Sequence, residues 1–348
     1  MFGLEIWLAG VMMVSLTMYV LAAGADFGGG VWDMLATGPR AKLQRKTIAD
    51  AIGPIWEANH VWLILVVVLL FVAFPVAYAA ISTALHIPLT IMLIGIVLRG
   101  SAFVFRAYDD QSDEVQRRWG RLFAGASVVT PIMLGICVGA IASGDIRVDV
   151  ETGIVQTDFF SSWLAPFPLA IGFLTLALFA FLAAVYLTLE TDDPALQEDF
   201  RRRALGSAVA VGGFALLSFL FSAEGAPLIR QGLAEAWWSL PFQLFTGVVA
   251  TSTLWAVWGR YYQFARMLAM IQVTMILWGW GLAQFPYIVE PDLTFTNTAT
   301  SDNVMRPLLI ALAAGAVLLV PSLWYLFRVF KGEQGAGGEG QGAGGQYP

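Results

Sequence analysis

Long apolar runs constrain the fold of this chain more than any other feature of its sequence. A hydrophobic run of about 20 residues crosses the hydrocarbon core of a bilayer as a helix, and about nine such runs are present. They cover roughly residues 4–34, 52–75, 80–104, 122–143, 163–189, 205–223, 240–258, 267–285 and 307–329. Charged residues make up only 13% of the chain, about half their share in soluble domains. The sequence therefore predicts an all-α integral membrane bundle of about nine transmembrane helices.

The distribution of Lys and Arg predicts the orientation of this bundle. Of the 19 basic residues, fifteen fall in the gaps on one side, three on the other, and Arg99 lies inside a run. Because basic residues stay in the cytoplasm, we expect the N-terminus outside and the C-terminus inside. Glu5 and the length of the first run distinguish it from a secretory signal, so we expect it to stay in the mature protein. Residues 1–330 then form the membrane domain, and the Gly-rich residues 331–348 form a disordered cytoplasmic tail.

Ionisable side chains inside the runs are few, and they predict where a functional site lies. Such groups are costly in a bilayer and usually face the protein interior or water. Asp26 and Asp33 are seven residues apart, and Glu57 and His60 are three apart, so each pair shares a helix face. With Arg99, all five lie in the cytoplasmic half of their runs. This favours a hydrated entry for cytoplasmic protons, with the alternative that Asp33 and Arg99 extend to the inner headgroups.

The two histidines do not indicate a haem held between them. His60 and His86 differ in expected depth by about 10 Å or more, too far to ligate one iron from opposite sides. Ligation by one histidine with a methionine or Cys137 stays open. We interpret His60 as a hydrogen-bonding member of the polar group, His86 as a packing or interface residue, and Cys137 as a buried hydrophobe. No basic stripe with interleaved aromatics indicates nucleic-acid binding.

Glycines and tryptophans next to these polar residues predict close packing. The first run contains four glycines that leave one helix face almost without side chains, so a neighbouring helix can approach. They are Gly24, Gly28, Gly29 and Gly30. In the second run Trp56 and Trp62 frame the polar residues Glu57, Asn59 and His60.

Five stretches of the sequence together carry a family resemblance. They are "GADFGGGVWDML", "IGPIWEANHVWLI", "LRGSAFVFR", "WLAPFPLAIGFLTLALFAFLAAVYLTLET" and "WGWGLAQFPYIVEPDLTFTN". In family order and at family spacing over residues 1–330, they resemble subunit II of the cytochrome bd quinol oxidases, including the cyanide-insensitive branch. Members of that family have nine spans with the N-terminus outside, as expected here from the runs and the basic residues.

The resemblance implies a function for the whole complex. Such oxidases oxidise ubiquinol or menaquinol, reduce O2 to water, and take protons from the cytoplasm. Subunit I holds two haems b and one haem d, and subunit II binds none directly. The expected partners are subunit I, quinol and membrane lipid, in a bacterial or archaeal-type cytoplasmic membrane. Small single-helix accessory subunits and a structural quinone in this chain are left open.

The resemblance also implies roles for individual residues. Asp26 and Glu57 match the family's carboxylates for proton entry at the subunit interface, Trp62 its motif tryptophan, and Arg99 its "R-G" arginine. The predicted proton path is then Asp26, Glu57, Asn59, His60 and Arg99, walled from lipid by Trp56 and Trp62. The chain departs from the family at Val104, where many relatives have Glu, and at His60, where others have Gln. The second departure suggests that His60 adjusts the function of this position and is not indispensable for it.

Two other functions fit the same residues. A stand-alone proton-coupled transporter also places acids and Arg in the membrane, but it predicts an inverted repeat with broken helices at midplane. A purely structural scaffold subunit differs from the proton path only in whether Asp26 and Glu57 are needed. The sequence does not decide between the proton path and the scaffold.

Overall fold

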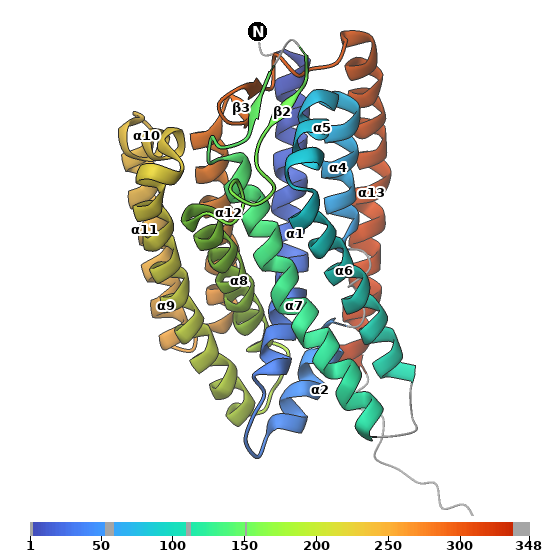
Figure 1. The fold of residues 1–348 in the computed structure, drawn as a ribbon. Coiled ribbons are helices and arrows are strands. Elements are labelled where there is room, and N and C mark those ends of the chain that lie inside the picture. Colours follow the sequence, from blue (N-terminus) through green and yellow to red (C-terminus); the bar gives the residue numbers. More distant parts are fainter. Residues whose placement is uncertain (1–2, 53–58, 109–112, 150–151, 337–348) are drawn as a thin grey trace, which may run out of the picture.

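The apolar runs fold into a nearly all-helical bundle (Figure 1). The computed structural model describes residues 3–52, 59–108, 113–149 and 152–336. The helices described are α1 (Leu4–Met34), α2 (Ala41–Ile52), α4 (Val61–Ala73), α5 (Pro75–Ala84), α6 (His86–Tyr108), α7 (Asp113–Ile141), α8 (Pro166–Leu187), α9 (Pro194–Gly225), α10 (Pro227–Glu235), α11 (Ser239–Trp258), α12 (Tyr262–Gln284) and α13 (Asp302–Ala336). The prediction of an all-α membrane protein is confirmed, with two short hairpins added to it.

The number of membrane spans agrees with the sequence. Within the described residues, eight helices are long and apolar enough to cross a bilayer, and a bent pair brings the number to nine. The last helix, α13, continues to Ala336, past residue 331 where the tail was expected to begin. Residues 337–348 of the predicted tail lie outside the described residues.

The bent pair consists of α4 and α5, whose axes turn by 117° at Phe74. Phe74 has non-helical backbone angles, and Pro75 begins the next helix, where its missing N–H costs nothing. Proline cannot continue a preceding helix because its ring clashes with the turn before it. As a result, the third span begins at His86 rather than near residue 80 as predicted from hydropathy.

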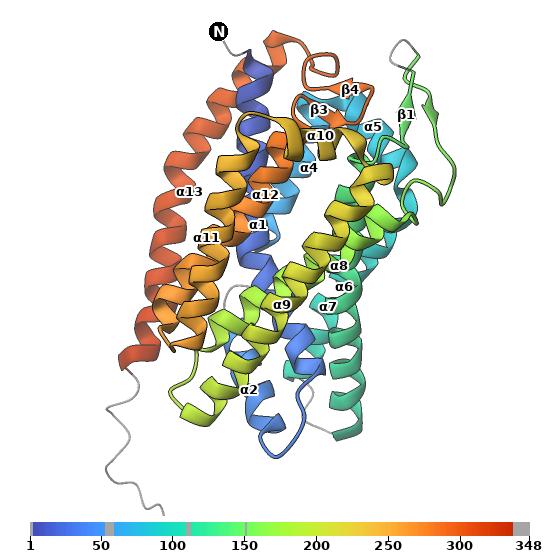
Figure 2. The same cartoon turned by 90° about the vertical axis from the view of Figure 1, so that its left-hand side faces the viewer.

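The core of the bundle lies around α1 and α8. The apolar window of α8 is mostly buried, whereas that of α13 is almost entirely exposed along one edge of the molecule (Figure 2). The helix α1 packs against α2, α4, α7, α8 and α12, and α6 packs against α7. This arrangement puts the polar stretch of α1 at the centre of the chain.

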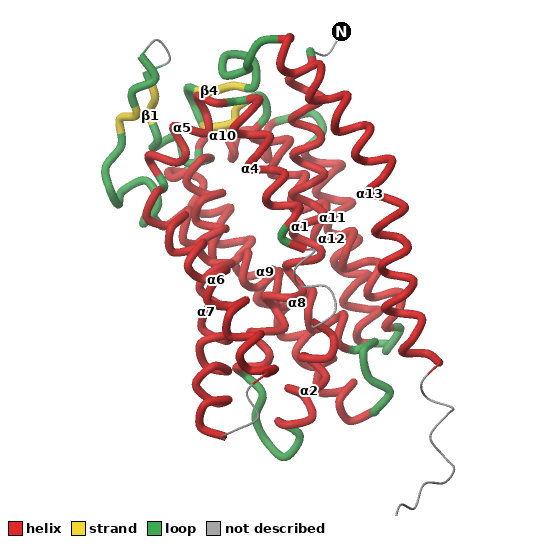
Figure 3. Tube along the Cα trace, turned by 90° about the vertical axis from the view of Figure 1, so that its right-hand side faces the viewer, coloured by secondary structure: helices red, strands yellow, loops and turns green. Residues whose placement is uncertain are grey.

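Two hairpins lie together at the end of the bundle where α1 begins, and α2 lies at the opposite end (Figure 3). The first pairs β1 (Arg147–Val148) with β2 (Val155–Gln156), and the second pairs β3 (Tyr287–Val289) with β4 (Leu293–Thr294). Arg147 binds the carboxylate of Asp292 through two nitrogens at 2.8 and 3.0 Å, joining the two hairpins. We call the described parts of residues 142–165 together with residues 285–301 the hairpin cap.

Candidate functional site

Asp26 and Asn59 meet in the interior of the bundle. Asp26 lies in the polar stretch of α1 and is 4% exposed, and Asn59 lies two residues before the start of α4 and is 3% exposed. The Asn59 side-chain amide donates a short hydrogen bond to Oδ2 of Asp26. Because a buried carboxylate is stabilised by a charge-assisted hydrogen bond, this contact holds the beginning of α4 against α1.

Arg99, in α6, is enclosed next to this pair. The residue is only 2% exposed, and its Cζ lies 4.7 Å from the ring centroid of Phe27 and 5.1 Å from that of Phe123. Aromatic faces attract a cation electrostatically at such distances. Its Nε and Nη2 have no hydrogen-bond partner among the described residues. The side chain is therefore held inside the protein and does not extend to the membrane surface.

His60 lies on the other side of the same group. Its ring centroid is 6.0 Å from those of Tyr19 and Phe27, both on α1. Nδ1 of His60 and the hydroxyl of Tyr19 are buried without a hydrogen-bond partner among the described residues. Buried polar atoms are nearly always hydrogen-bonded, often to ordered water. We call Asp26, Asn59, His60 and Arg99 the polar cluster.

The glycines of α1 let three helices approach this stretch. A Cβ on Gly28 would lie 1.9 Å from the backbone oxygen of Phe179 in α8. On Gly29 it would lie 2.7 Å from Ile52 in α2, and on Gly30 2.1 Å from the Ser127 hydroxyl in α7. Only the Gly28 contact is with backbone, so the close approach of α8 to α1 depends on this glycine, whereas the contacts at Gly29 and Gly30 are with side chains. Gly24 similarly faces the ring of Phe179.

The other residues that the sequence predicted for this site do not belong to the polar cluster as the structure describes it. Glu57 and Trp56 lie outside the described residues. Trp62 is partly buried and packs against the main hydrophobic core. Asp33 is buried, and its backbone oxygen accepts a hydrogen bond from Arg45 at 3.4 Å.

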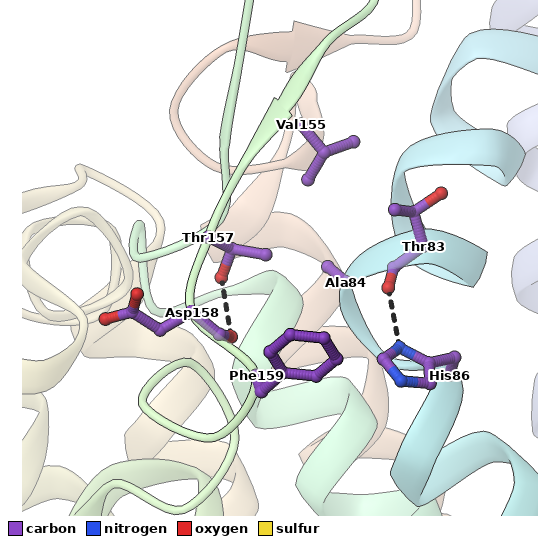
Figure 4. A pocket seen from close by; sticks show the side chains of 7 residues that line it. All are labelled: Thr83, Ala84, His86, Val155, Thr157, Asp158 and Phe159. Carbon is purple, nitrogen blue, oxygen red and sulfur yellow. Dashed lines mark hydrogen bonds between the residues drawn. The ribbon is translucent and has the colours of Figure 1, made fainter.

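His86 lies apart from the polar cluster, in a pocket of about 340 Å³ beneath the first hairpin (Figure 4). Its Nδ1 donates to the backbone oxygen of Thr83 at 2.9 Å, and its ring meets that of Phe159 edge-on. In Figure 4 the carboxylate of Asp158 points away from the imidazole. This pocket therefore does not extend the polar cluster.

The described residues contain no cluster of side chains that typically ligate a metal ion. No three of their His, Cys, Asp and Glu side chains lie close enough together to hold a metal. The ring of His60 is packed by Tyr19 and Phe27, and His86 lies against Phe159.

Sequence reasoning missed the aromatic residues that enclose the cluster. Tyr19 carried a signal, because it is seven residues before Asp26 and shares its helix face. Phe27 and Phe123 carried none, since phenylalanine is ordinary in an apolar run. Only the packing of α1 against α6 and α7 identifies them as neighbours of Arg99.

Comparisons with known proteins agree on one family. The family model described as "Cytochrome bd terminal oxidase subunit II" matches residues 4–330. The "Putative cytochrome bd menaquinol oxidase subunit II" of Bacillus subtilis is 24% identical over 90% of this chain and 91% of its own length. The "Cytochrome bd-I ubiquinol oxidase subunit 2" of Escherichia coli is also 24% identical, over 93% of each chain.

A solved structure shares the fold. It is described as "The structure of bd oxidase from Geobacillus thermodenitrificans", and the superposition has a TM-score of 0.78. The match covers 94% of this chain and 98% of that one at 23% sequence identity. At this identity the match establishes the arrangement of the helices.

Proposed function

The chain belongs to the family of cytochrome bd terminal oxidase subunit II, and from this premise we propose that its polar cluster conducts cytoplasmic protons to subunit I. The complex oxidises a membrane quinol and reduces O2 to water, as the names of the relatives in Bacillus subtilis and Escherichia coli suggest. Its two haems b and one haem d are held by subunit I. The family match removes the alternative of a stand-alone transporter.

The observation that carries this proposal is the buried group formed by Asp26, Asn59 and Arg99. Burying opposite charges in a membrane is expensive unless they are paired or hydrogen-bonded, and intramembrane ionisable residues mostly serve function. Here Arg99 lies within electrostatic range of Asp26. Its Nε and Nη2, which have no hydrogen-bond partner in the described part of the chain, can bind water. A carboxylate, an imidazole and water within one enclosed group can pass a proton along hydrogen bonds.

The surface beside the cluster supports delivery to a partner subunit. His60 is partly exposed, and α4 and α6 present large apolar side chains to the outside. These are Val61, Ile64, Val67, Val68 and Phe71 on α4, and Ile94, Val97 and Leu98 on α6. We place subunit I against this face, so that the partly exposed His60 lies at the interface and the buried Asn59 lies directly behind it. Glu57, three residues before His60, belongs to the same path on sequence grounds.

Orientation completes the proposal. The α2 end of the bundle carries Arg40, Lys42, Arg45 and Lys46, and basic residues favour the cytoplasmic side. The hairpin cap and the beginning of α1 then face outward, in the cytoplasmic membrane of a bacterium. Protons enter from the α2 end.

The test compares quinol-driven O2 consumption in membranes that contain this chain and its subunit I. Asp26→Asn and Glu57→Ala should each lower turnover by about 10²-fold, the loss typical of a missing proton-transfer group, with unchanged haem spectra. Ser15→Ala is the matched control, because Ser15 is buried on the same helix and bonds Val11 within it. Normal respiration of both acid variants would instead make the chain a scaffold.

A further inference from the structure

A cavity of about 280 Å³ opens between α1, α2, α6 and α7, at the α2 end of the bundle. Its polar lining consists of Asp33 on α1 and Asp50 on α2. Its apolar walls are formed by Ile48, Ile52, Phe103 and Phe123. Asp50 is exposed and Asp33 is buried, so the cavity leads from a solvated carboxylate to an enclosed one.

The inner wall of this cavity is also a wall of the polar cluster. The Phe123 ring lines the cavity and lies 5.1 Å from Cζ of Arg99. Phe103 supports it, with ring centroids 6.0 Å apart. One aromatic ring therefore lies between the cavity and a guanidinium whose Nε and Nη2 have no partner among the described residues.

The helix α1 connects the cavity, through Asp33, with the polar cluster, through Asp26. Asp33 and Asp26 share a helix face two turns apart, about 10 Å along the axis. Between them, Gly30 brings the hydroxyl of Ser127 against the α1 backbone. That hydroxyl donates to the backbone oxygen of Phe123 at 2.7 Å and keeps lone pairs for another donor. A few waters spaced by ordinary hydrogen-bond distances cover the remaining separation.

We propose that this cavity is the hydrated vestibule through which cytoplasmic protons reach Asp26, with Asp50 at its mouth, Asp33 at its floor and Phe123 as the barrier. The inference rests on the proposed role of Asp26 in proton transfer. The negative charge of Asp50 raises the local concentration of cations, hydronium ions among them, as a carboxylate at a cleft entrance does. Asp33 passes protons inward by way of water and Ser127.

The first test measures whether water reaches the cavity from the α2 side. Ala49 also lines the cavity, so Ala49→Cys in a Cys137→Ala background places a thiol there. In inside-out vesicles that contain the full complex, a charged membrane-impermeant thiol reagent should modify this position and reduce turnover. Thr152→Cys, on the exposed hairpin cap, should react only in right-side-out vesicles and keep full turnover. A thiol at position 49 that reacts from neither side, or only from the Thr152 side, overturns the proposal.

The second test concerns the floor of the vestibule. Asp33→Asn should lower the turnover number about tenfold, less than a directly positioned proton-transfer group would cost, with unchanged haem spectra and KM for quinol. Asp33→Glu should restore most of the rate, because it restores a carboxylate. If Asp26→Asn is slow while Asp33→Asn is normal, the vestibule is wrong and the proposed function stands. If both are normal, the proposed function itself fails.

Discussion

The hairpin cap and the polar cluster both contain charged side chains, and these side chains are stabilised in different ways. In the cap, the carboxylate of Asp292 accepts two hydrogen bonds from Arg147 and one from the backbone N–H of Val148. In the cluster, the Arg99 guanidinium lies between aromatic rings, and its Nε and Nη2 have no hydrogen-bond partner among the described residues. The arrangement in the cap stabilises the packing of the two hairpins, since both carboxylate oxygens of Asp292 accept hydrogen bonds. The arrangement in the cluster leaves capacity for water and therefore for proton movement.

Glu290 is an exception within the cap. It is 1% exposed, and its Oε1 has no hydrogen-bond partner among the described residues. Burial raises the pKa of this carboxyl to about 8, whereas the hydrogen bond from Arg147 lowers the pKa of Asp292. Two acids two residues apart are thus shifted in opposite directions by their surroundings. The cap therefore contains one acid that behaves as a structural anion and one that favours the neutral form.

The largest expected effect concerns Arg99. Arg99→Gln removes the positive charge that balances Asp26, so turnover should fall by about 10²-fold or more, while Arg99→Lys should retain part of it because the charge remains. The measurement is quinol-driven O2 consumption normalised to the haem content. Arg230→Gln is the matched control, because Arg230 also lies over a phenylalanine ring, 4.9 Å from that of Phe219, away from the cluster. Equal activity of both variants would remove the distinction between the two regions.

The next effect is a pH dependence of stability from Glu290. Because the folded state binds this proton more tightly, the free energy of unfolding falls as pH rises from about 4.5 to about 8. Glu290→Gln removes this contribution, so the variant should lose less stability across that range, by about 1 to 3 kcal/mol. Thermal unfolding of the complex at pH 5 and pH 8 measures it. Glu235 is exposed, so Glu235→Gln should keep the wild-type pH dependence of stability. A Glu290→Gln variant that also keeps this pH dependence would contradict the prediction.

A smaller effect is expected for the ion pair of the cap. Asp292→Ala removes three hydrogen bonds, but Arg147 is largely exposed, so solvent screening limits the loss to about 1 kcal/mol. Turnover should stay normal, because the pair only ties the two hairpins together. Unfolding and O2 consumption measured on one preparation test both parts. A large loss of turnover at unchanged stability would give the cap a role in the reaction.

The smallest effect is expected for His60. Glutamine can occupy the same space and offer both a donor and an acceptor, so His60→Gln should change turnover by only about twofold, well short of losing a proton-transfer group. Phenylalanine at this position keeps the ring and removes the nitrogens. A large loss for His60→Phe together with a small loss for His60→Gln would show that hydrogen bonding, not titration, is the contribution of this residue.

Local sequence patterns predicted much of the helical framework, for a physical reason. A bilayer requires long apolar helices whose polar groups are satisfied within the helix, so hydropathy alone locates most spans. The same approach placed Asp26, Asp33, Glu57, His60 and Arg99 in the cytoplasmic half of their runs. The structure joins Asp26 to Asn59, the residue before His60, by a hydrogen bond. Opposite chain directions in neighbouring spans were sufficient for that inference.

Features that depend on tertiary packing were not predicted. The turn at Phe74 interrupts an apolar stretch whose hydropathy continues into α5, and only Pro75 marks it in the sequence. The enclosure of Arg99 depends on Phe27 and Phe123, which are distant in sequence and chemically ordinary for a membrane helix. The sequence does not mark Glu290 as buried, because its burial is produced by the fold of the hairpin cap.

The turn between α4 and α5 has a consequence for the surrounding lipid. The thirteen residues of α4 rise about 20 Å, which is less than the hydrocarbon core of about 30 Å. The helix α5 then continues at 117° to α4. Lipids beside this bend contact a protein surface whose hydrophobic thickness is smaller than that of the bilayer. Each ångström of this mismatch costs a fraction of a kcal/mol. A neighbouring subunit that covers the bend removes this cost, so bilayer thickness becomes one determinant of how tightly the two subunits associate.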